Sequence, residues 1–528
     1  MVRIAGAVRP RLARAVTAAK PQVARVTRAV GPRLARITPP TSLTRFPALS
    51  RPAARRTWQY TAGAATAGLA LAAGVVTAAG PWDANGQRTA ERERAAAQER
   101  AGGTDHDGGS GTRAGGPRPA PSAASVLAGL GGTATTVRSA PAAKAVADLL
   151  DPLLDSSALG RAHAAAVVDV ATGRRLYDAG ADKALTPAST TKIATAVAAL
   201  SALGADHRLT TRAALEPDTG ELVLVGGGDP TLTAHKESGG WASLRALARD
   251  TAAALKKRGV HQVTLSYDTT LYAGPALHPI GVNDNLAPVS ALMADEGRTD
   301  DSTAGPVTRV TDPAAAAADA FAGFLADDGI RTTSPGPSKA TSRAATLATV
   351  SSPPLSDLVE RMLTNSDNDI AEALARQTAL ATGRRPSFDG GAAAIAARLG
   401  KLGLPVAGAD FHDGSGLNRD DRTTADLLTA LLVKAGSPSH PELRPVLTGL
   451  PIAGFTGTLA DRYSDGAAGV VRAKTGTLTG VNTLAGTVVD RDGRLLAFAF
   501  LASDTTDPAQ AQAALDRTAT ALAGCGCD

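Results

Sequence analysis

The sequence is poor in cysteine, histidine and aromatic side chains, and each shortage narrows what the chain can be. Its only 2 cysteines, Cys525 and Cys527, stand at the C-terminal end of 528 residues, so no distant pair can staple the fold. We expect an unstructured tail there, although a bridge between the two is feasible outside the cell. The 8 histidines form no cluster with metal-ligand spacing, so we expect no metal site.

Acidic residues are missing from residues 1–56, a basic arm with 13 Lys and Arg side chains. Subtracting these 13 from the 55 basic side chains leaves 42 against 49 acidic ones, so the net charge of +6 comes from the arm. Such an arm would suit nucleic acid. We favour a cytoplasmic arm beside a membrane, and therefore no nucleic-acid partner, because of the segment that follows it.

Charged residues are also missing from residues 57–82, which are apolar and rich in small side chains. Trp58, Tyr60 and Trp82 stand at the ends of this segment. Its length suits a bilayer, aromatic residues are enriched at membrane interfaces, and a basic flank stays on the cytoplasmic side. We therefore predict a single-pass protein of the cell membrane with its bulk outside the cell. Cleavage near Ala78 would instead release a secreted protein.

The rest of the chain divides by composition. Residues 83–137 are rich in Gly, Pro, Ser and charged residues, which predicts a disordered linker. Beyond it, predicted strands and helices alternate, which favours a mixed α/β (α+β) fold. We expect residues 138–214 and 346–528 to form one domain, interrupted by one or more mostly-β inserted domains over 215–345. The clearest predicted elements are a hairpin over 164–177, helices over 355–374 and 508–522, and strands over 470–474, 483–489 and 495–501.

The first candidate motif, Ser189-Thr190-Thr191-Lys192, stands in the first turn of a helix that is predicted to begin at Thr186-Pro187 and to end at Gly204. A serine three residues before a lysine places both side chains on one helical face. A lysine in a partly dry pocket loses its charge more easily and can then take the proton of the serine. The pair predicts a serine nucleophile with a lysine base.

Two further motifs lie far downstream. Ser366-Asp367-Asn368 interrupts a predicted helix, and Lys474-Thr475-Gly476 ends a predicted strand. Each of the three motifs alone has an ordinary structural explanation: a helix start, a turn or helix cap, and a strand that runs into a turn. Their order and their settings favour one common site.

A rival catalytic set consists of His412, Asp413 and Ser415. Neighbours in sequence rarely converge on one substrate atom, and Gly414-Ser415-Gly416 lacks the Gly-x-Ser-x-Gly pattern of a nucleophile elbow. We therefore interpret this segment as a functional loop.

The ordered set S-x-x-K, S-x-N and K-T-G resembles that of the penicillin-binding proteins and serine β-lactamases. The long interval between Ser189 and Ser366 is similar to the D-Ala-D-Ala carboxypeptidases/endopeptidases of the penicillin-binding protein 4 type, in which extra domains interrupt a transpeptidase-like fold. The similarity covers about residues 142–523. Further segments match that family: Gly228-Asp229-Pro230-Thr231-Leu232, Pro288-Val289-Ser290-Ala291-Leu292, Asp413-Gly414-Ser415-Gly416-Leu417-Asn418-Arg419, Leu450-Pro451-Ile452-Ala453-Gly454 and Gly457-Thr458-Leu459.

The resemblance implies a serine-type D-Ala-D-Ala carboxypeptidase that acts on peptidoglycan stem peptides, needs no cofactor and is acylated by β-lactams. It implies that the catalytic residues are Ser189, Lys192, Ser366, Asn368 and Lys474. The backbone N–H groups of Ser189 and Thr477 would form the oxyanion hole. The residues implied to bind substrate are Thr475, Gly476 and Thr477 for a terminal carboxylate, and Arg419 and Asp284 for the diamino acid of the stem peptide.

Two alternatives stay open at the level of sequence. One is a β-lactamase or esterase on the same scaffold, and the other is a non-catalytic wall-binding or sensor protein. Both carboxypeptidase and endopeptidase activity are compatible with these residues.

Overall fold

The computed structural model describes residues 143–333, 335–463 and 466–526, which fall within one compact unit of the chain. The predicted basic arm, membrane segment and linker lie outside these residues, so they stay predictions of the sequence. In the part of the chain that is described, no helix combines the length and the hydrophobicity that crossing a bilayer requires.

The first and last parts of the described chain share one antiparallel sheet with the strand order β10-β11-β12-β1-β2. Ala162 pairs with Ser503 and Asp169 with Leu496, so β1 and β12 join the two ends of the chain inside the sheet. The predicted hairpin and the three predicted C-terminal strands are confirmed. The five strands are β1 (Ala162–Asp169), β2 (Arg175–Ala179), β10 (Val471–Leu478), β11 (Val481–Val489) and β12 (Leu495–Ser503).

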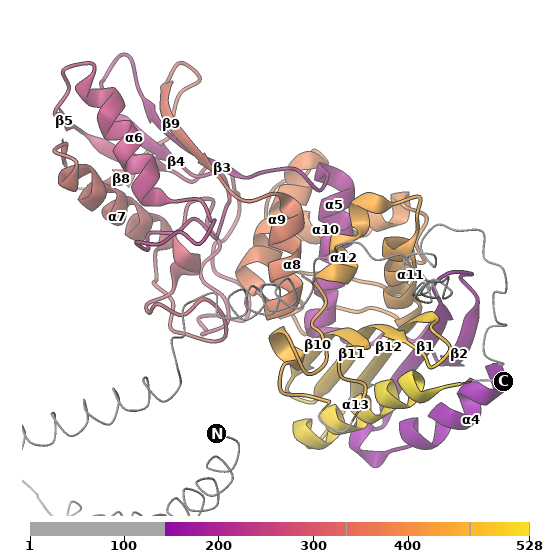
Figure 1. The fold of residues 1–528 in the computed structure, drawn as a ribbon. Helices are drawn as coiled ribbons and strands as arrows, with labels where there is room; N and C mark the ends of the chain where they lie inside the picture. The colour runs from indigo at the N-terminus through magenta and orange to yellow at the C-terminus, as the bar shows by residue number, and fades with distance from the viewer. Residues whose placement is uncertain (1–142, 334, 464–465, 527–528) are drawn as a thin grey trace, which may run out of the picture. The chain divides into compact units, whose positions relative to one another are not determined.

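Helices cover both faces of this sheet (Figure 1), which explains why the middle strand β12 is buried almost throughout. Two helices, α4 (Ala143–Leu154) and α13 (Pro508–Gly524), pack on one face. The other face carries the remaining helices of this domain: α5 (Thr191–Leu203), α8 (Leu355–Asn365), α9 (Asn368–Ala381), α10 (Phe388–Lys401), α11 (Ala425–Gly436) and the single turn α12 (Pro445–Thr448).

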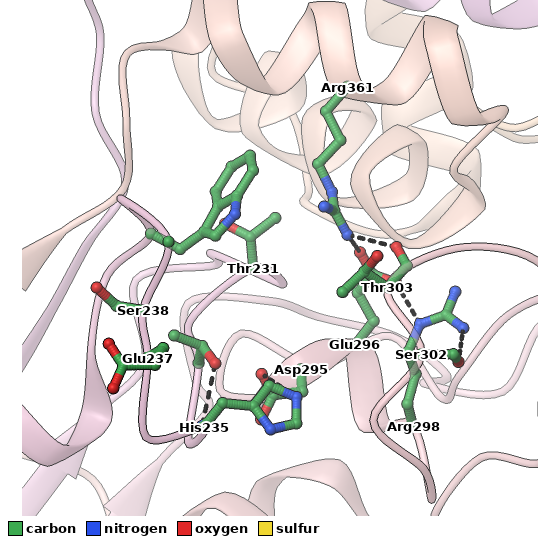
Figure 2. Close-up of a pocket in the computed structure, with 13 residues that line it drawn as sticks. Thr231, His235, Glu237, Ser238, Asp295, Glu296, Arg298, Ser302, Thr303 and Arg361 are labelled. Carbon is green, nitrogen blue, oxygen red and sulfur yellow. Dashed lines mark hydrogen bonds and ion pairs between the residues drawn. The ribbon is translucent and has the colours of Figure 1, made fainter. Parts of the chain in front are cut away.

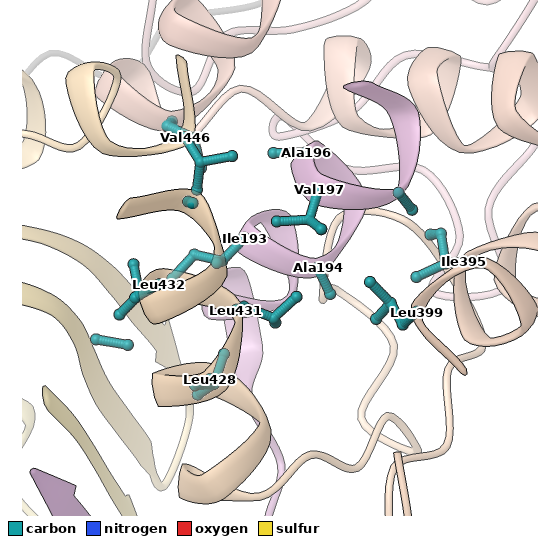
Figure 3. Packing of buried hydrophobic residues seen from close by; sticks show 14 of the residues in the cluster. Ile193, Ala194, Ala196, Val197, Ile395, Leu399, Leu428, Leu431, Leu432 and Val446 are labelled. Carbon is teal, nitrogen blue, oxygen red and sulfur yellow. The ribbon is translucent and has the colours of Figure 1, made fainter. Parts of the chain in front are cut away.

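Helix α5 is the centre of that second layer, with every residue from Thr191 to Leu200 buried. Figure 3 shows Ile193 and Val197 on this helix among leucine side chains of α11, with Ile395 and Leu399 of α10 close by. Small side chains such as Ala194 and Ala196 let the neighbouring helices approach closely. This packing gives the residues at the start of α5 a rigid support.

The inserted region forms a second five-stranded sheet with the order β8-β6-β4-β3-β9. Helices α6 (Leu244–Lys256) and α7 (Pro313–Asp327) share one hydrophobic core with it, so the region is mixed α/β and the expectation of a mostly-β insertion is wrong. The outer strands β3 and β9 also carry the sheet beyond the predicted limits of 215 and 345. The strands are β3 (Thr210–Leu215), β4 (Leu222–Val225), β6 (Leu265–Asp268), β8 (Gly336–Pro337) and β9 (Ala345–Ser351), with a separate pair β5 (Gln262–Val263) and β7 (Arg331–Thr332).

The interruption predicted at Ser366 and Asn368 within the helical stretch 355–374 is confirmed: Ser366 ends α8 in the left-handed region (φ 58°, ψ 40°), and Asp367 then caps α9. The C-terminal end differs from the prediction. Cys525 is buried and disulfide-bonded, so the expectation of an unstructured tail is wrong at this residue; Cys527 lies outside the described residues.

Candidate active site

The nucleophile candidate Ser189 stands in a single 3-10 turn, Ala188–Thr190, that leads into α5. The sequence predicted the first turn of an α-helix at this point, so the local geometry is tighter than expected. The preceding Ala188 has φ +48°, a conformation that costs an alanine free energy and recurs at functional sites. The turn still places Lys192 Nζ at 3.0 Å from Ser189 Oγ, as the spacing of the motif predicted.

Lys192 is fully buried and donates three hydrogen bonds, which use all the N–H groups of an ammonium. Its Nζ lies 3.0 Å from Ser189 Oγ, 2.6 Å from Asn368 Oδ1 and 2.7 Å from the carbonyl oxygen of Ser415. Two of the three predicted motifs therefore meet at this amine. The third acceptor, Ser415, belongs to the loop that the sequence offered as a rival triad.

Burial lowers the pKa of Lys192 to about 8, against the nearby carboxylates of Asp413 and Glu372, which raise it. Desolvation is the largest of these effects because removing water penalises the charged amine. A lysine with a pKa of about 8 has a substantial neutral fraction near neutral pH, and only the neutral amine can accept a proton.

Lys474 is the second fully buried lysine of the site. It donates to Ser366 Oγ at 2.8 Å and to the carbonyl oxygen of Thr475 at 2.7 Å. Burial holds its pKa well below the usual value, and the positive charge of Lys192 lowers it further. The three motifs thus form two linked pairs: Ser189 with Lys192, and Ser366 with Lys474.

The S-x-N motif gains its shape from the break between α8 and α9. Ser366 adopts the left-handed conformation, which turns the chain so that Asn368 begins α9. The Asn368 amide then bridges two partners, because Oδ1 accepts from Lys192 and Nδ2 donates to the carbonyl oxygen of Asn285 at 2.9 Å. Asn285 comes from the inserted region, and no pattern in the sequence predicted this contact.

The K-T-G motif lies on β10, the edge strand of the sheet. An edge strand has backbone N–H and C=O groups that no neighbouring strand uses. Thr475 and Thr477 both line the cavity next to Ser189, and Thr475 Oγ1 donates to Thr458 Oγ1 at 3.0 Å. The setting suits the predicted oxyanion role of the Thr477 backbone.

Two glycines let the other motif segments approach the nucleophile turn. A Cβ at Gly476 would lie 2.7 Å from the carbonyl oxygen of Pro187 and would overlap Thr483 Oγ1. A Cβ at Gly416 would overlap the carbonyl oxygen of Ala188, and Gly416 also has φ +82°. Both positions therefore require glycine for steric reasons.

Ser189, Ser366, Asn368, Thr475 and Thr477 border a cavity of about 350 Å³. Besides the motif residues, it is lined by two arginines from the inserted region, Arg298 and Arg309. Both are paired with buried acids: Arg298 Nε lies 2.9 Å from Glu296 Oε2, and Arg309 donates to Asp369 Oδ2 at 3.0 Å. The inserted region therefore forms part of the wall of the site.

Glu296 connects this wall to the S-x-N motif. Figure 2 shows Arg298 and Arg361 converging on its carboxylate, at the edge of a separate cavity of about 180 Å³. Burial, and then the charge of Glu296, hold the pKa of Asp367 well above its usual value. The acids beside Asn368 are thus fixed by residues that lie outside all three motifs.

The two predicted contacts to a diamino acid are placed differently. Arg419 is exposed and donates to the carbonyl oxygen of Thr479, just beyond the end of β10. Asp284 is exposed on the loop next to Asn285, and neither side chain is among those that line the cavity. Their roles in binding substrate stay predictions.

The rival triad does not assemble. His412 is 40% exposed and lies 3.4 Å from Asp410, whereas Asp413 and Ser415 are fully buried. Asp413 accepts hydrogen bonds from the backbone of its own loop. The interpretation of this segment as a loop is confirmed, and the only part of it that reaches Lys192 is the Ser415 carbonyl oxygen.

Among the described residues, two groups of three side chains have ligand atoms close enough to hold a metal ion: His278, Glu372 and Asp413, and Glu296, Asp367 and Asp369. Each group already has protein partners for its charge. Backbone N–H groups bind Asp413 and Glu372, and arginines pair with Glu296 and Asp369. These partners supply the compensation that a cation would otherwise provide.

Residues 145–306 and 299–522 match the model of the "D-Ala-D-Ala carboxypeptidase 3 (S13) family". A carboxypeptidase of Mycobacterium tuberculosis is 38% identical over 432 residues, which are 79% of this chain and 92% of that protein. Carboxypeptidase DacB of Mycolicibacterium smegmatis is 39% identical over 68% of this chain and 80% of its own length. A D-alanyl-D-alanine carboxypeptidase of Actinomadura sp. strain R39 is 30% identical over 68% and 81% of the two chains.

Among solved structures, penicillin binding protein 4 (dacB) of Haemophilus influenzae has the same fold. The TM-score is 0.59 at 24% identity, with 71% of this chain and 98% of that chain covered. A second structure of that protein holds a β-lactam and matches with a TM-score of 0.55 at 23% identity over the same shares of the two chains.

Proposed function

The chain belongs to the D-Ala-D-Ala carboxypeptidase 3 (S13) family and is a serine-type D-Ala-D-Ala carboxypeptidase, and we propose that Ser189 is its nucleophile. One observation carries the proposal: Lys192 Nζ lies 3.0 Å from Ser189 Oγ in a site that buries the lysine completely. A desolvated amine within hydrogen-bond reach of a hydroxyl is the arrangement that general-base activation requires.

The reaction follows from this pair. Neutral Lys192 takes the proton of Ser189 Oγ while that oxygen attacks the carbonyl carbon of the penultimate D-alanine. The electron pair of the carbonyl bond moves to its oxygen, which the N–H groups of Ser189 and Thr477 bind. The carbon–nitrogen bond then breaks, and the leaving amine takes a proton from Ser366. The proton on Lys192 then returns to Lys474, so both amines regain their starting state. Neutral Lys192 takes a proton from a water molecule as that water attacks the ester carbon, and it gives this proton to Ser189 Oγ as the Oγ–carbon bond breaks, which releases the acid product and restores the Ser189 hydroxyl.

The second lysine pair serves the leaving amine. Lys474 donates to Ser366 Oγ at 2.8 Å, so the Ser366 hydroxyl can pass a proton to the amine while Lys474 supplies the next one. Asn368 holds Lys192 from the other side. Thr475 and Thr477, on either side of Gly476 in β10, line the same cavity. A terminal carboxylate bound there would accept hydrogen bonds from their hydroxyl groups.

The substrate we propose is the D-Ala-D-Ala end of a peptidoglycan stem peptide. Asp284 and Arg419 would bind the amine and carboxylate of its diamino acid, a role supported by their positions in the family motifs and by their exposure to solvent. Because the penicillin binding protein 4 of Haemophilus influenzae has been solved with a β-lactam, we also propose that β-lactams acylate Ser189.

The decisive experiment incubates the full-length protein with penicillin and measures its intact mass, with Ser189→Ala beside it. We expect one adduct of the mass of penicillin on the wild type and none on the variant. The wild type should also release D-alanine from a D-Ala-D-Ala peptide. A protein that turns penicillin over rapidly without an adduct would be a β-lactamase, and one that leaves drug and peptide intact would contradict catalysis altogether.

We further propose that residues 57–82 anchor the protein in the cell membrane, with residues 143–526 outside the cell. The absence of charge in that segment, its aromatic ends and the basic arm before it support this placement. A peptidoglycan substrate also lies outside the membrane.

A further inference from the structure

Beneath the general base lies a buried cluster of ionisable side chains that the reaction above does not use. Its members come from three separate segments: His278 from the inserted region, Glu372 and Arg376 from α9, and Asp413 from the loop after α10. The side chains of all four are at most 1% exposed. Charged groups are rarely buried to this extent without a specific task for their contacts.

The hydrogen bonds of His278 define its state. The Ile280 backbone N–H donates to His278 Nδ1 at 3.2 Å, so Nδ1 is an acceptor and carries no proton. Nε2 therefore carries the proton and donates to Asp413 Oδ2 at 3.0 Å. The ring also packs edge-on against Phe388, with centroids 5.0 Å apart at 87°. His278 is thus a neutral, oriented donor to one carboxylate.

Asp413 transmits this contact to its own loop. Oδ1 accepts from the Ser415 and Gly416 N–H groups at 3.0 and 2.6 Å, and Oδ2 accepts from the Asn418 N–H at 2.7 Å. Glu372 Oε1 accepts from the Gly414 and Ser415 N–H groups at 3.0 and 2.9 Å. Two buried carboxylates therefore hold the loop from below.

The held loop ends at the general base. The Ser415 carbonyl oxygen accepts from Lys192 Nζ at 2.7 Å, and Gly416 lies against the carbonyl oxygen of Ala188 beside the nucleophile. A displacement of this loop would therefore move one of the three acceptors that fix the amine. Errors of about 1 Å in such positions cost on the order of 100-fold in rate.

We propose that His278 is a positioning residue: its Nε2–H fixes Asp413, which holds the Ser415 carbonyl oxygen on Lys192 and so aims the amine at Ser189. The inserted region thereby contributes a residue that orients the general base of the catalytic domain. The inference rests on the proposed roles of Ser189 and Lys192. It concerns geometry, since His278 lies below the loop and does not line the cavity.

The charged groups that face His278 are few. Glu372 faces it from α9, with Arg376 beside Glu372, and Asp413 faces it from the loop, with Asp421 next to Asp413. Burial, and then the charge of Asp413, raise the pKa of Asp421 to about 10, so Asp421 is protonated. From α10 the uncharged ring of Phe388 packs against the imidazole.

The test compares two substitutions in the full-length protein. His278→Phe keeps a planar ring against Phe388 but removes the donor, whereas His278→Gln loses the ring but places an amide N–H near the Nε2 position. His412→Gln is the matched control, because His412 is the partly exposed histidine next to Asp413 in the sequence and pairs with Asp410 instead. For each protein, we would measure the rate of penicillin acylation against pH across the Lys192 pKa of about 8, together with the fraction of molecules that form an adduct.

For His278→Phe we expect acylation about 10- to 100-fold slower per competent molecule. The midpoint of the pH profile should also move to lower pH, because the ammonium form of Lys192 loses an acceptor. His278→Gln and His412→Gln should retain most of the wild-type rate and its midpoint.

An unchanged rate and midpoint in His278→Phe would overturn the proposal. The proposal would also fall if both His278 variants formed adducts in a smaller fraction of molecules while the molecules that react did so at the wild-type rate. His278 would then serve only the packing of the fold. An upward movement of the midpoint would contradict the proposed direction of the coupling. Failure of the Ser189 proposal looks different, since the wild type itself would then form no adduct, and the role of His278 would fall with it.

Discussion

Lys192 and Lys474 are both fully buried, which is rare for lysine because burial removes the water that stabilises an ammonium group. This loss of solvation favours the neutral amines: burial lowers the pKa of Lys192 to about 8 and holds that of Lys474 well below its usual value. Near neutral pH, Lys192 can therefore act as a base, while Lys474 can pass protons to Ser366, to which it donates a hydrogen bond. The sequence identified these residues because their chemistry requires these types in this order.

We predict that acylation by penicillin follows the neutral fraction of Lys192. Below a pH of about 8 the amine is protonated and cannot accept a proton, so the rate should fall about tenfold for each pH unit. Above that pH the rate should level off. The same shift means that the unfolded chain, with a lysine pKa of 10.5, binds more protons than the folded one between about pH 8 and 10.5. This group's contribution to the free energy of unfolding therefore rises with pH in that window.

The measurement is the rate of adduct formation by intact mass in buffers of constant ionic strength. Lys183→Met, a change at an exposed lysine just before the nucleophile turn, should leave the midpoint in place. The range from pH 6 to 9 extends about two units below and one unit above the pKa of Lys192. An acylation rate that stays constant over this range would show that the neutral fraction of Lys192 does not limit the rate.

At the scale of elements, the site depends on how closely two segments approach the nucleophile turn. Ala188–Thr190 meets the edge strand β10 through Gly476 and the Asp413 loop through Gly416, and neither approach leaves room for a Cβ. The sequence predicted the strand and the helix, since both have clear hydrophobic patterns. It did not predict the 3-10 turn or the left-handed Ser366, because tertiary contacts rather than local propensity stabilise these conformations.

We predict that Gly476→Ala slows acylation on the order of 10- to 100-fold and lowers stability by about 1–3 kcal/mol. The added methyl would overlap Thr483 Oγ1 and press on the carbonyl oxygen of Pro187, which would displace β10 from the nucleophile turn. Acylation rates and thermal unfolding of the full-length protein measure both effects.

Gly323→Ala provides the matched control for this change. Gly323 lies on the exposed side of α7, where a Cβ would meet nothing within 4 Å, so alanine should stabilise the helix slightly and leave acylation unchanged. Equal rates for Gly476→Ala and the wild type would show that β10 does not need its close approach to the turn.

At the scale of the whole molecule, the inserted region is both the best and the worst predicted part. Its position between the first two motifs was expected from their spacing. The region is mixed α/β rather than mostly β, however, and its sheet extends beyond the predicted limits of 215 and 345. Its contacts with the site, through His278, Asn285 and Glu296, left no trace in the sequence. They come from the long loop between β6 and α7, and single polar residues in a loop have no periodicity that would indicate their partners.

The last prediction concerns the proposed membrane anchor, residues 57–82, which lie outside the described residues. If residues 57–82 span the bilayer, the full-length protein should stay with the membrane fraction after both a high-salt and an alkaline wash. High salt releases proteins that only their basic arm holds, because it screens the attraction to anionic lipids. A variant that lacks residues 57–82 but keeps the arm should leave the membrane under high salt. Release of the full-length protein by salt alone would refute the anchor, and a mature mass that begins just after Ala78 would show that the segment is removed as a signal peptide.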